Sequence, residues 1–295
     1  MIYFSILALF LLSCNPDQAT PPANNTTVMN PEQKKYWYSG EAEISSYELK
    51  QSRYGEIREG KSALVFVTEP FSPSKNTKSD RASSDDVSVL KLNFTKKFNT
   101  GVYPYSMMTS SFFPFENGKH SLKVSSSSQE WCGHTYMELK NKKSFEVQVN
   151  SYFEGESSNN TKLEKAIIED DIWSMIRLQP EALPKGKQQV IPSFFYLRLL
   201  HKELKSYTCE MEVTKLDAQL NNYSLKFLEI DRQLDIQFEA SFPHKIISWK
   251  ESYSSGFGSK KQRLETSGQL IKSIKSDYWN KNSNADGGLR DTLGL

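Results

Sequence analysis

Apolar and polar residues alternate with a period of two along most of this chain, which is typical of half-buried β-strands. In the first such segment, residues 37–54, apolar residues lie at Ala42 and Ile44 and then at Tyr47 and Leu49. The parity changes once between these pairs, which predicts a strand with a β-bulge. Further strands are expected over residues 61–68, 87–94, 102–115, 122–127, 129–140, 145–153, 192–213, 223–227, 234–238, 243–249 and 264–279. A helix is the alternative for the last of these segments.

Two local signals refine this pattern. Glu59-Gly60 is expected to turn the chain between the first two strands. The long strand that begins at Pro192 keeps one parity from Phe195 to Val213, and its length predicts a bend or break near residues 201–206.

One segment predicts a helix instead. Thr161 and Glu164 form a capping-box pattern, and Ile168, Ile172, Met175 and Leu178 follow at helical spacing. We therefore expect one α-helix at about 161–178, with the acidic residues 169–171 on its solvated face. Many strands with a single helix do not fit α/β alternation. The fold class is therefore mainly β, with one large antiparallel sheet curved into a barrel or half-barrel.

The first fourteen residues have a different character. Residues 2–12 are almost entirely apolar, and they are too few for a helix that spans a bilayer, which needs about 20 residues. A signal-peptide core fits this length. Leu11-Leu12-Ser13-Cys14 resembles the lipobox of bacterial lipoproteins, and this resemblance implies cleavage after Ser13 and acyl chains on Cys14. An ordinary secretion signal and a buried N-terminal strand are the alternatives.

The segment after Cys14 is rich in Pro, Asn and Thr and nearly lacks large apolar side chains. Such a composition cannot offset the entropy of ordering the chain. We therefore expect a signal peptide over residues 1–13, a disordered tether over 14–33 and a single β-rich domain over 34–295. The expected location is the cell envelope, with a lipid anchor in the outer membrane that faces the periplasm.

Composition excludes little else. The 37 basic and 35 acidic residues nearly cancel, so no electrostatic footprint for nucleic acid is present. Besides Cys14, the chain has two cysteines, Cys132 and Cys209, which could pair in an oxidising compartment or remain two separate thiols.

Candidate chemistry is concentrated in the run Glu130-Trp131-Cys132-Gly133-His134. On a strand, Cys132 and His134 would point to one face, where they could line a pocket, begin a zinc site or form a nucleophile pair. A core role for all of them is the alternative. Tyr103, Tyr105 and Phe113, with Phe112 and Phe115, either line an apolar cavity or fill the core. No P-loop, G-x-S-x-G or H-E-x-x-H motif occurs, and no metal or cofactor is expected.

Several runs resemble a family of Bacteroidota lipoproteins that commonly carries the label "septum formation inhibitor Maf". These runs are residues 37–56, 101–106, 129–136, 180–184 and 278–282, and the likeness covers nearly all of the mature chain. The label implies a nucleoside triphosphate pyrophosphatase. Maf pyrophosphatases are α/β proteins with a Ser-x-Arg-Arg element, and this chain has no Arg-Arg pair, so no residue role carries over. The strand order is also similar to the half-barrels of periplasmic lipoprotein carriers.

Three functions follow as expectations. The first is a non-catalytic binding or envelope-maintenance module, in which the curled sheet and its helix enclose a groove for an apolar ligand or a protein partner. The second is a hydrolase or redox enzyme that uses Cys132 and His134. The third is the pyrophosphatase that the family label implies.

Overall fold

The computed structural model describes residues 29–81, 83–116, 118–156 and 159–295. The expected signal peptide, Cys14 and most of the expected tether lie outside these residues. Helix α1 (Pro31–Trp37) begins within the last three positions of that tether. There, Asn30 and Gln33 form a capping box, which satisfies the free N–H groups of the first turn.

The described residues form sixteen strands and four short α-helices. The strands are β1 (Ala42–Arg53), β2 (Glu56–Ser72), β3 (Thr77–Lys78), β4 (Val87–Thr100), β5 (Tyr103–Pro114), β6 (Lys123–Glu130), β7 (Gly133–Asn141), β8 (Phe145–Ser151), β9 (Asn159–Leu163), β10 (Ile167–Ile168), β11 (Gly186–Ile191), β12 (Tyr207–Lys215), β13 (Leu220–Phe227), β14 (Arg232–Glu239), β15 (Ile246–Ser255) and β16 (Gln262–Ser276). The remaining α-helices are α2 (Glu169–Leu178), α3 (Phe194–Leu200) and α4 (Gly288–Leu293). The described residues also contain five short 3-10 helices: η1 (Glu154–Glu156), η2 (Pro180–Ala182), η3 (Gly258–Lys260), η4 (Tyr278–Asn280) and η5 (Asn284–Gly287).

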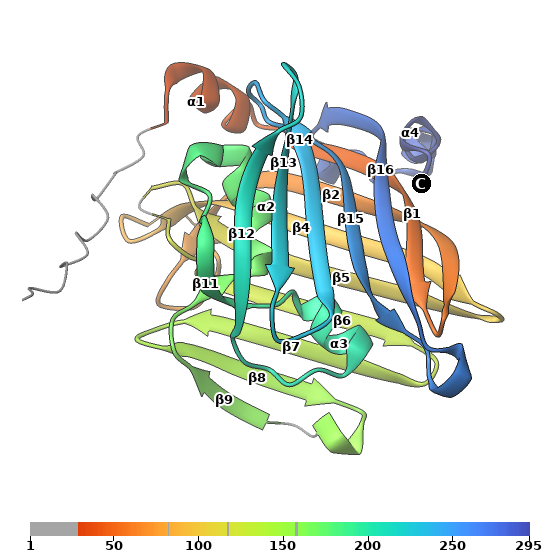
Figure 1. The fold of residues 1–295 in the computed structure, drawn as a ribbon. Helices are drawn as coiled ribbons and strands as arrows, with labels where there is room; N and C mark the ends of the chain where they lie inside the picture. The colour runs from red at the N-terminus through yellow and green to blue at the C-terminus, as the bar shows by residue number, and fades with distance from the viewer. Residues whose placement is uncertain (1–28, 82, 117, 157–158) are drawn as a thin grey trace, which may run out of the picture.

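All the strands belong to one curved sheet. Its order is β10-β11-β12-β13-β14-β15-β16-β1-β2-β4-β5-β6-β7-β8-β9, with β3 paired to β2. Figure 1 shows β12 to β16 crossing in front of β4 to β8 at a steep angle, with α2 and α3 between the two layers. Only residues 164–166 separate the edge strands β9 and β10, yet these two strands do not pair. The sheet is therefore an open half-barrel, which confirms the expected mainly β fold.

The first hairpin shows one correct and one wrong prediction. The register of β1 against β16 shifts between Ser46 and Tyr47, so the predicted bulge is present. The turn predicted at Glu59-Gly60 is wrong, because β2 runs through both residues. The chain turns instead at Tyr54-Gly55, where both residues have positive φ, as a tight hairpin turn requires. Gly60 is needed for close packing, since a Cβ there would lie 2.2 Å from the Lys97 carbonyl oxygen.

The predicted helix at 161–178 is only half right. Residues 161–163 extend β9, where Thr161 pairs with Val147 and Leu163 with Phe145. The backbone hydrogen bonds offered by β8 replace the expected capping box. Helix α2 begins at Glu169 and has no side-chain cap from Ile168.

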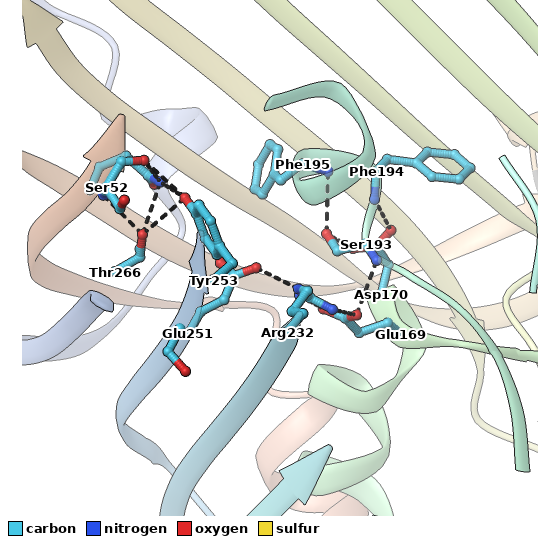
Figure 2. Close-up of polar contacts among 12 residues, drawn as sticks. Ser52, Glu169, Asp170, Ser193, Phe194, Phe195, Arg232, Glu251, Tyr253 and Thr266 are labelled. Atoms are coloured by element: carbon cyan, nitrogen blue, oxygen red, sulfur yellow. Dashed lines mark hydrogen bonds and ion pairs between the residues drawn. The ribbon is translucent and has the colours of Figure 1, made fainter. Parts of the chain in front are cut away.

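The acidic start of α2 is buried, so the expected solvated face is wrong. Glu169, Asp170 and Asp171 are each at most 3% exposed. Figure 2 shows the partners that permit this: Arg232 of β14 donates to Glu169 at 2.6 Å, and Asp170 accepts from Ser193 Oγ and the Phe194 amide. Asp171 accepts from the Ser121 amide at 3.0 Å. Burial raises the pKa of Asp170 and of Asp171 to about 7, so each carboxyl keeps its proton over a wider pH range than in water.

A second buried pair fixes the other end of α2. Arg177 makes two hydrogen bonds to Glu43 of β1, at 2.5 and 2.6 Å, and both side chains are 1% exposed. Although burial disfavours the charged forms, each charge stabilises the other. Arg177 lowers the pKa of Glu43, and Glu43 raises the pKa of Arg177. With Glu169 at its first turn and Arg177 at its last, α2 also carries charges that suit the helix dipole.

Helix α3 replaces the start of the predicted long strand. Ser193 caps it through the Phe195 amide, and residues 194–199 are all buried. A segment buried on every side shows no helical period, because apolar residues then satisfy either pattern. The predicted break at 201–206 is present, since β12 begins at Tyr207.

The space around α2 is filled. Trp173 packs edge-on against Phe94 of β4 and Trp249 of β15, with ring centroids 4.8 and 5.6 Å apart, so α2 contacts both layers. The cavity among these rings has a volume of about 10 Å³, about the minimum for one water molecule. The expected ligand groove between sheet and helix is therefore occupied by side chains here. Within the described residues, no helix has the length and apolarity needed to cross a bilayer.

The buried ion pairs lead to a stability prediction. Arg232→Met leaves Glu169 without its cation, and it leaves Glu251, which accepts from Arg232 Nε at 2.8 Å, with only Lys96 at 3.9 Å. We expect a loss of about 3–5 kcal/mol in the free energy of unfolding, because an unpaired charge remains buried. Urea denaturation measures it. The control Arg263→Met removes a half-exposed pair with Asp231 and should cost about 0–1 kcal/mol. Equal losses in the two variants would show that the buried Arg232 pairs matter no more than a surface pair.

Candidate functional site

The run predicted to carry chemistry forms the tip of a tight hairpin. Glu130 of β6 pairs with Gly133 of β7, which leaves Trp131 and Cys132 as a two-residue turn. The predicted strand over 129–140 is therefore interrupted, and the expectation that Cys132 and His134 share one strand face is wrong. The Glu130 carboxylate holds the turn by accepting from the Cys132 amide at 2.7 Å. Trp-Cys is not a turn signature, so the sequence pattern gave no warning of this interruption.

A groove of about 1030 Å³ lies beside this turn, on the outer face of the sheet. We name it the hairpin groove. Its lining residues are Pro104, Ser106, Ser127, Ser128, Gln129, Glu130, Trp131, Cys132, Gly133, His134, Thr135, Tyr136, Asn150, Ser151 and Tyr152. The structure thus brings three predicted candidates together in one place: Trp131, Cys132 and His134.

Aromatic rings stand exposed around the hairpin groove. Trp131 is 70% exposed and Tyr152 is 76% exposed, which is unusual for side chains of this size. The ring of Tyr103, another predicted candidate, stacks against Trp131 with centroids 6.2 Å apart. Gly133 lets Tyr152 approach the hairpin, since a Cβ at Gly133 would lie 2.8 Å from that ring. The rings are therefore positioned on a rigid β-scaffold.

The groove carries almost no charge. Among its lining residues, Glu130 is the only Asp, Glu, Lys or Arg, and it is 5% exposed. Burial and the neighbouring Glu138 carboxylate raise the pKa of Tyr136 to about 12, so its phenol is neutral at physiological pH. The remaining polar groups are hydroxyls, amides and the exposed His134 imidazole. The surface offers aromatic faces and uncharged hydroxyl and amide groups beside one imidazole.

The hairpin is anchored from below by α3. Arg198 donates to the Glu130 carboxylate at 3.2 Å and to Thr135 Oγ1 at 3.1 Å. Arg198 is 4% exposed and lies over the ring of Phe153 at 4.5 Å. A buried, hydrogen-bonded Arg–Glu pair has little freedom to move. The inner core therefore sets the position of the outer turn that carries Trp131.

Two other predicted candidates lie in the core. Tyr105 is 1% exposed, stacks on Phe98 at 4.7 Å, and its hydroxyl accepts from Arg53 at 3.1 and 3.3 Å. Phe113 is also 1% exposed. Neither lines the hairpin groove.

The cysteines show no arrangement for nucleophilic or metal chemistry in the described residues. Cys132 is exposed and Cys209 is buried, and both are free thiols. Burial raises the pKa of Cys209 to about 12, which makes it unreactive. No hydrogen bond between Cys132 and His134 occurs in the described part of the chain, and no group of three metal-ligating side chains was found there.

Two further hollows adjoin this region. One, of about 640 Å³, continues from the hairpin groove through Pro104 and Ser106 and is basic on balance, with Lys61, Lys97 and Arg290 beside Glu59. The other, of about 400 Å³, lies on the inner face beside α3, and its apolar lining residues are Met137, Val149, Leu197 and Leu204. Its wall includes Glu156 and Thr161, on either side of residues 157–158, which lie outside the described part.

Comparison with models of known families, with curated proteins and with solved structures finds no match to this chain. The candidate site thus depends on its own geometry.

The support from α3 can be tested at Glu130. Glu130→Ala removes the acceptor of the Cys132 amide and the partner of Arg198. We expect that amide to exchange with solvent at least tenfold faster, because the turn loses its hydrogen bond. Hydrogen exchange followed by NMR measures the rate. The control Glu146→Ala, on the exposed face of β8, should leave the rate unchanged. An unchanged rate in Glu130→Ala would show that Glu130 does not hold the turn.

Proposed function

We propose that this protein is a lipid-anchored binding module of the cell envelope without catalytic activity, and that it binds its partner in the hairpin groove. Its anchor is Cys14, and it faces the periplasm from the outer membrane. The observation that carries the binding role is the exposed, uncharged aromatic groove at the β6–β7 turn. Exposed large aromatic residues on a rigid scaffold are characteristic of recognition surfaces.

The position of the site follows from the filled space around α2. An apolar ligand between the sheet and α2 would need the space that Trp173, Phe94 and Trp249 occupy. The outer groove needs no such displacement. Tyr103 braces the Trp131 ring and the Glu130–Arg198 pair holds its turn, so binding does not have to order that ring.

The enzymatic alternatives receive no specific support. A Cys–His nucleophile pair requires the two side chains to meet, and no hydrogen bond joins Cys132 to His134 among the described residues. The mainly antiparallel sheet also differs from the α/β fold that the Maf label implies. We therefore propose neither a hydrolase nor a pyrophosphatase.

The anchor is tested by detergent phase partitioning of the protein from its own bacterium. The unmodified chain should enter the detergent phase, because two or more acyl chains anchor it stably. Cys14→Ala should remain in the aqueous phase. Cys132→Ala, which keeps the lipidation site, should behave as wild type. Retention of Cys14→Ala in the detergent phase would contradict the lipid anchor.

The binding role is tested with Trp131→Ala. Purified full-length protein in detergent should sediment with an envelope fraction of that bacterium, and Trp131→Ala should reduce the bound amount at least tenfold. The matched control is Trp279→Ala in η4, since Trp279 is 44% exposed but does not line the groove. Equal sedimentation of both variants would contradict binding in the hairpin groove.

A further inference from the structure

The chemistry of the hairpin groove restricts what can occupy it. An anionic ligand would require cations, and no Lys or Arg side chain lines this groove. A cationic ligand would require carboxylates, and the one in the lining, Glu130, is buried and paired with Arg198. An acyl chain would require a continuous apolar wall. Here, serine, glutamine and asparagine side chains lie among the rings.

A peptide cannot add to the sheet as a strand beside β6 or β7. β6 pairs with β5 and β7, and β7 pairs with β6 and β8, so the backbone groups of these two strands are already bonded. Strand addition needs a free sheet edge. A peptide bound on these strands would have to rely on side-chain contacts, without the row of backbone hydrogen bonds that strand addition supplies.

A saccharide complements both features of the groove, its exposed aromatic rings and its uncharged polar groups. One face of a pyranose ring presents C–H groups, which pack on an aromatic ring, and its edge presents hydroxyls, which act as both donors and acceptors. The groove offers the exposed rings of Trp131 and Tyr152 for the first. It offers Gln129, His134 and Asn150 for the second, and these lie on neighbouring strands.

The geometry is also suited to more than one sugar ring. The register places Gln129 opposite His134, and Tyr136 opposite both Ser127 and Asn150, so one row of polar groups crosses β6 and β7 and a second crosses β6, β7 and β8. The volume of about 1030 Å³ is at the upper end of the range for small-molecule sites, roughly 300–1,000 Å³. A single monosaccharide would leave much of this lining uncovered.

We propose that the hairpin groove binds an uncharged oligosaccharide, with sugar rings stacked on Trp131 and Tyr152 and hydroxyls bonded to Gln129, His134 and Asn150. This inference rests on the proposed binding function and gives it a ligand class. Two features order the site before the ligand arrives: the stacking of Tyr103 on Trp131 and the fixed turn above Arg198.

Calorimetric titration of the full-length protein with four neutral tetrasaccharides tests the proposal: chitotetraose, cellotetraose, maltotetraose and mannotetraose. At least one should bind with a Kd below 1 mM, and Trp131→Ala should weaken that binding at least tenfold. Trp279→Ala should leave it unchanged, and circular dichroism checks that both variants are folded. The proposal is overturned if none of the four binds, or if Trp131→Ala and Trp279→Ala have equal affinities.

Charge provides an independent readout. Binding of a neutral ligand should have the same Kd in 50 and 500 mM NaCl, and it should be unaffected by Lys97→Ala in the adjoining basic groove. A Kd that rises tenfold with salt, or on removal of Lys97, would show an anionic ligand and overturn the proposal.

The two failures are distinguishable. If Trp131-dependent sedimentation with the envelope fraction is found but no tetrasaccharide binds, the binding module stands and the oligosaccharide is wrong. Its partner is then a protein or a lipid, and protease treatment or solvent extraction of the fraction tells which. If a tetrasaccharide binds but sedimentation does not depend on Trp131, the ligand class stands and the envelope role fails.

Discussion

Two buried arginine–carboxylate pairs hold the short helix α2 inside the curved sheet, and the rest of the structure depends on them. Glu169 at one end pairs with Arg232 of β14, and Arg177 at the other end pairs with Glu43 of β1. Removing such charges from water is costly, and only close pairing with good hydrogen bonds makes it tolerable. Because each partner lies on the sheet, the pairs fix both the depth and the rotation of the helix. Trp173 then fills the space between the two layers.

This arrangement separates the inside of the half-barrel from its outside. Around α2 the interior is used for packing, and a ligand would have to displace aromatic rings there. A further buried pair, Arg198 with Glu130, transmits the same rigidity to the outer surface. It joins α3 in the interior to the β6–β7 turn, and thereby fixes the loop that presents Trp131. A surface site that is ordered in advance loses less entropy on binding.

The sequence predicted those features whose signal is local. Period-two alternation located most of the strands, and a single change of parity located the bulge at Ser46–Tyr47. The sequence could not predict the features that depend on residues far away along the chain. Glu169, Asp170 and Asp171 look solvated until Arg232, Ser193 and Ser121 are placed beside them. Thr161 has the sequence of a helix cap, and its role in β9 depends on the pairing offered by β8.

The same limit applies to the candidate site. The sequence singled out Trp131, Cys132 and His134 because of their chemistry, and these residues do line one groove. It missed Tyr152, Gln129 and Asn150, because they reach the groove only through the register of β6, β7 and β8. Tyr105 and Phe113 were proposed as site residues only because they are aromatic, but both are buried in the core.

The central claim is that α2 is a fixed part of the interior, so that binding takes place on the outer face. Native-state hydrogen exchange of the α2 amides, from Trp173 to Arg177, tests it most directly. If the claim is correct, these amides exchange only through global unfolding, with the same free energy as the slowest amides of β14 and β15. Exchange through a local opening with a much smaller free energy would contradict it, because α2 could then leave the sheet and make room for a ligand inside.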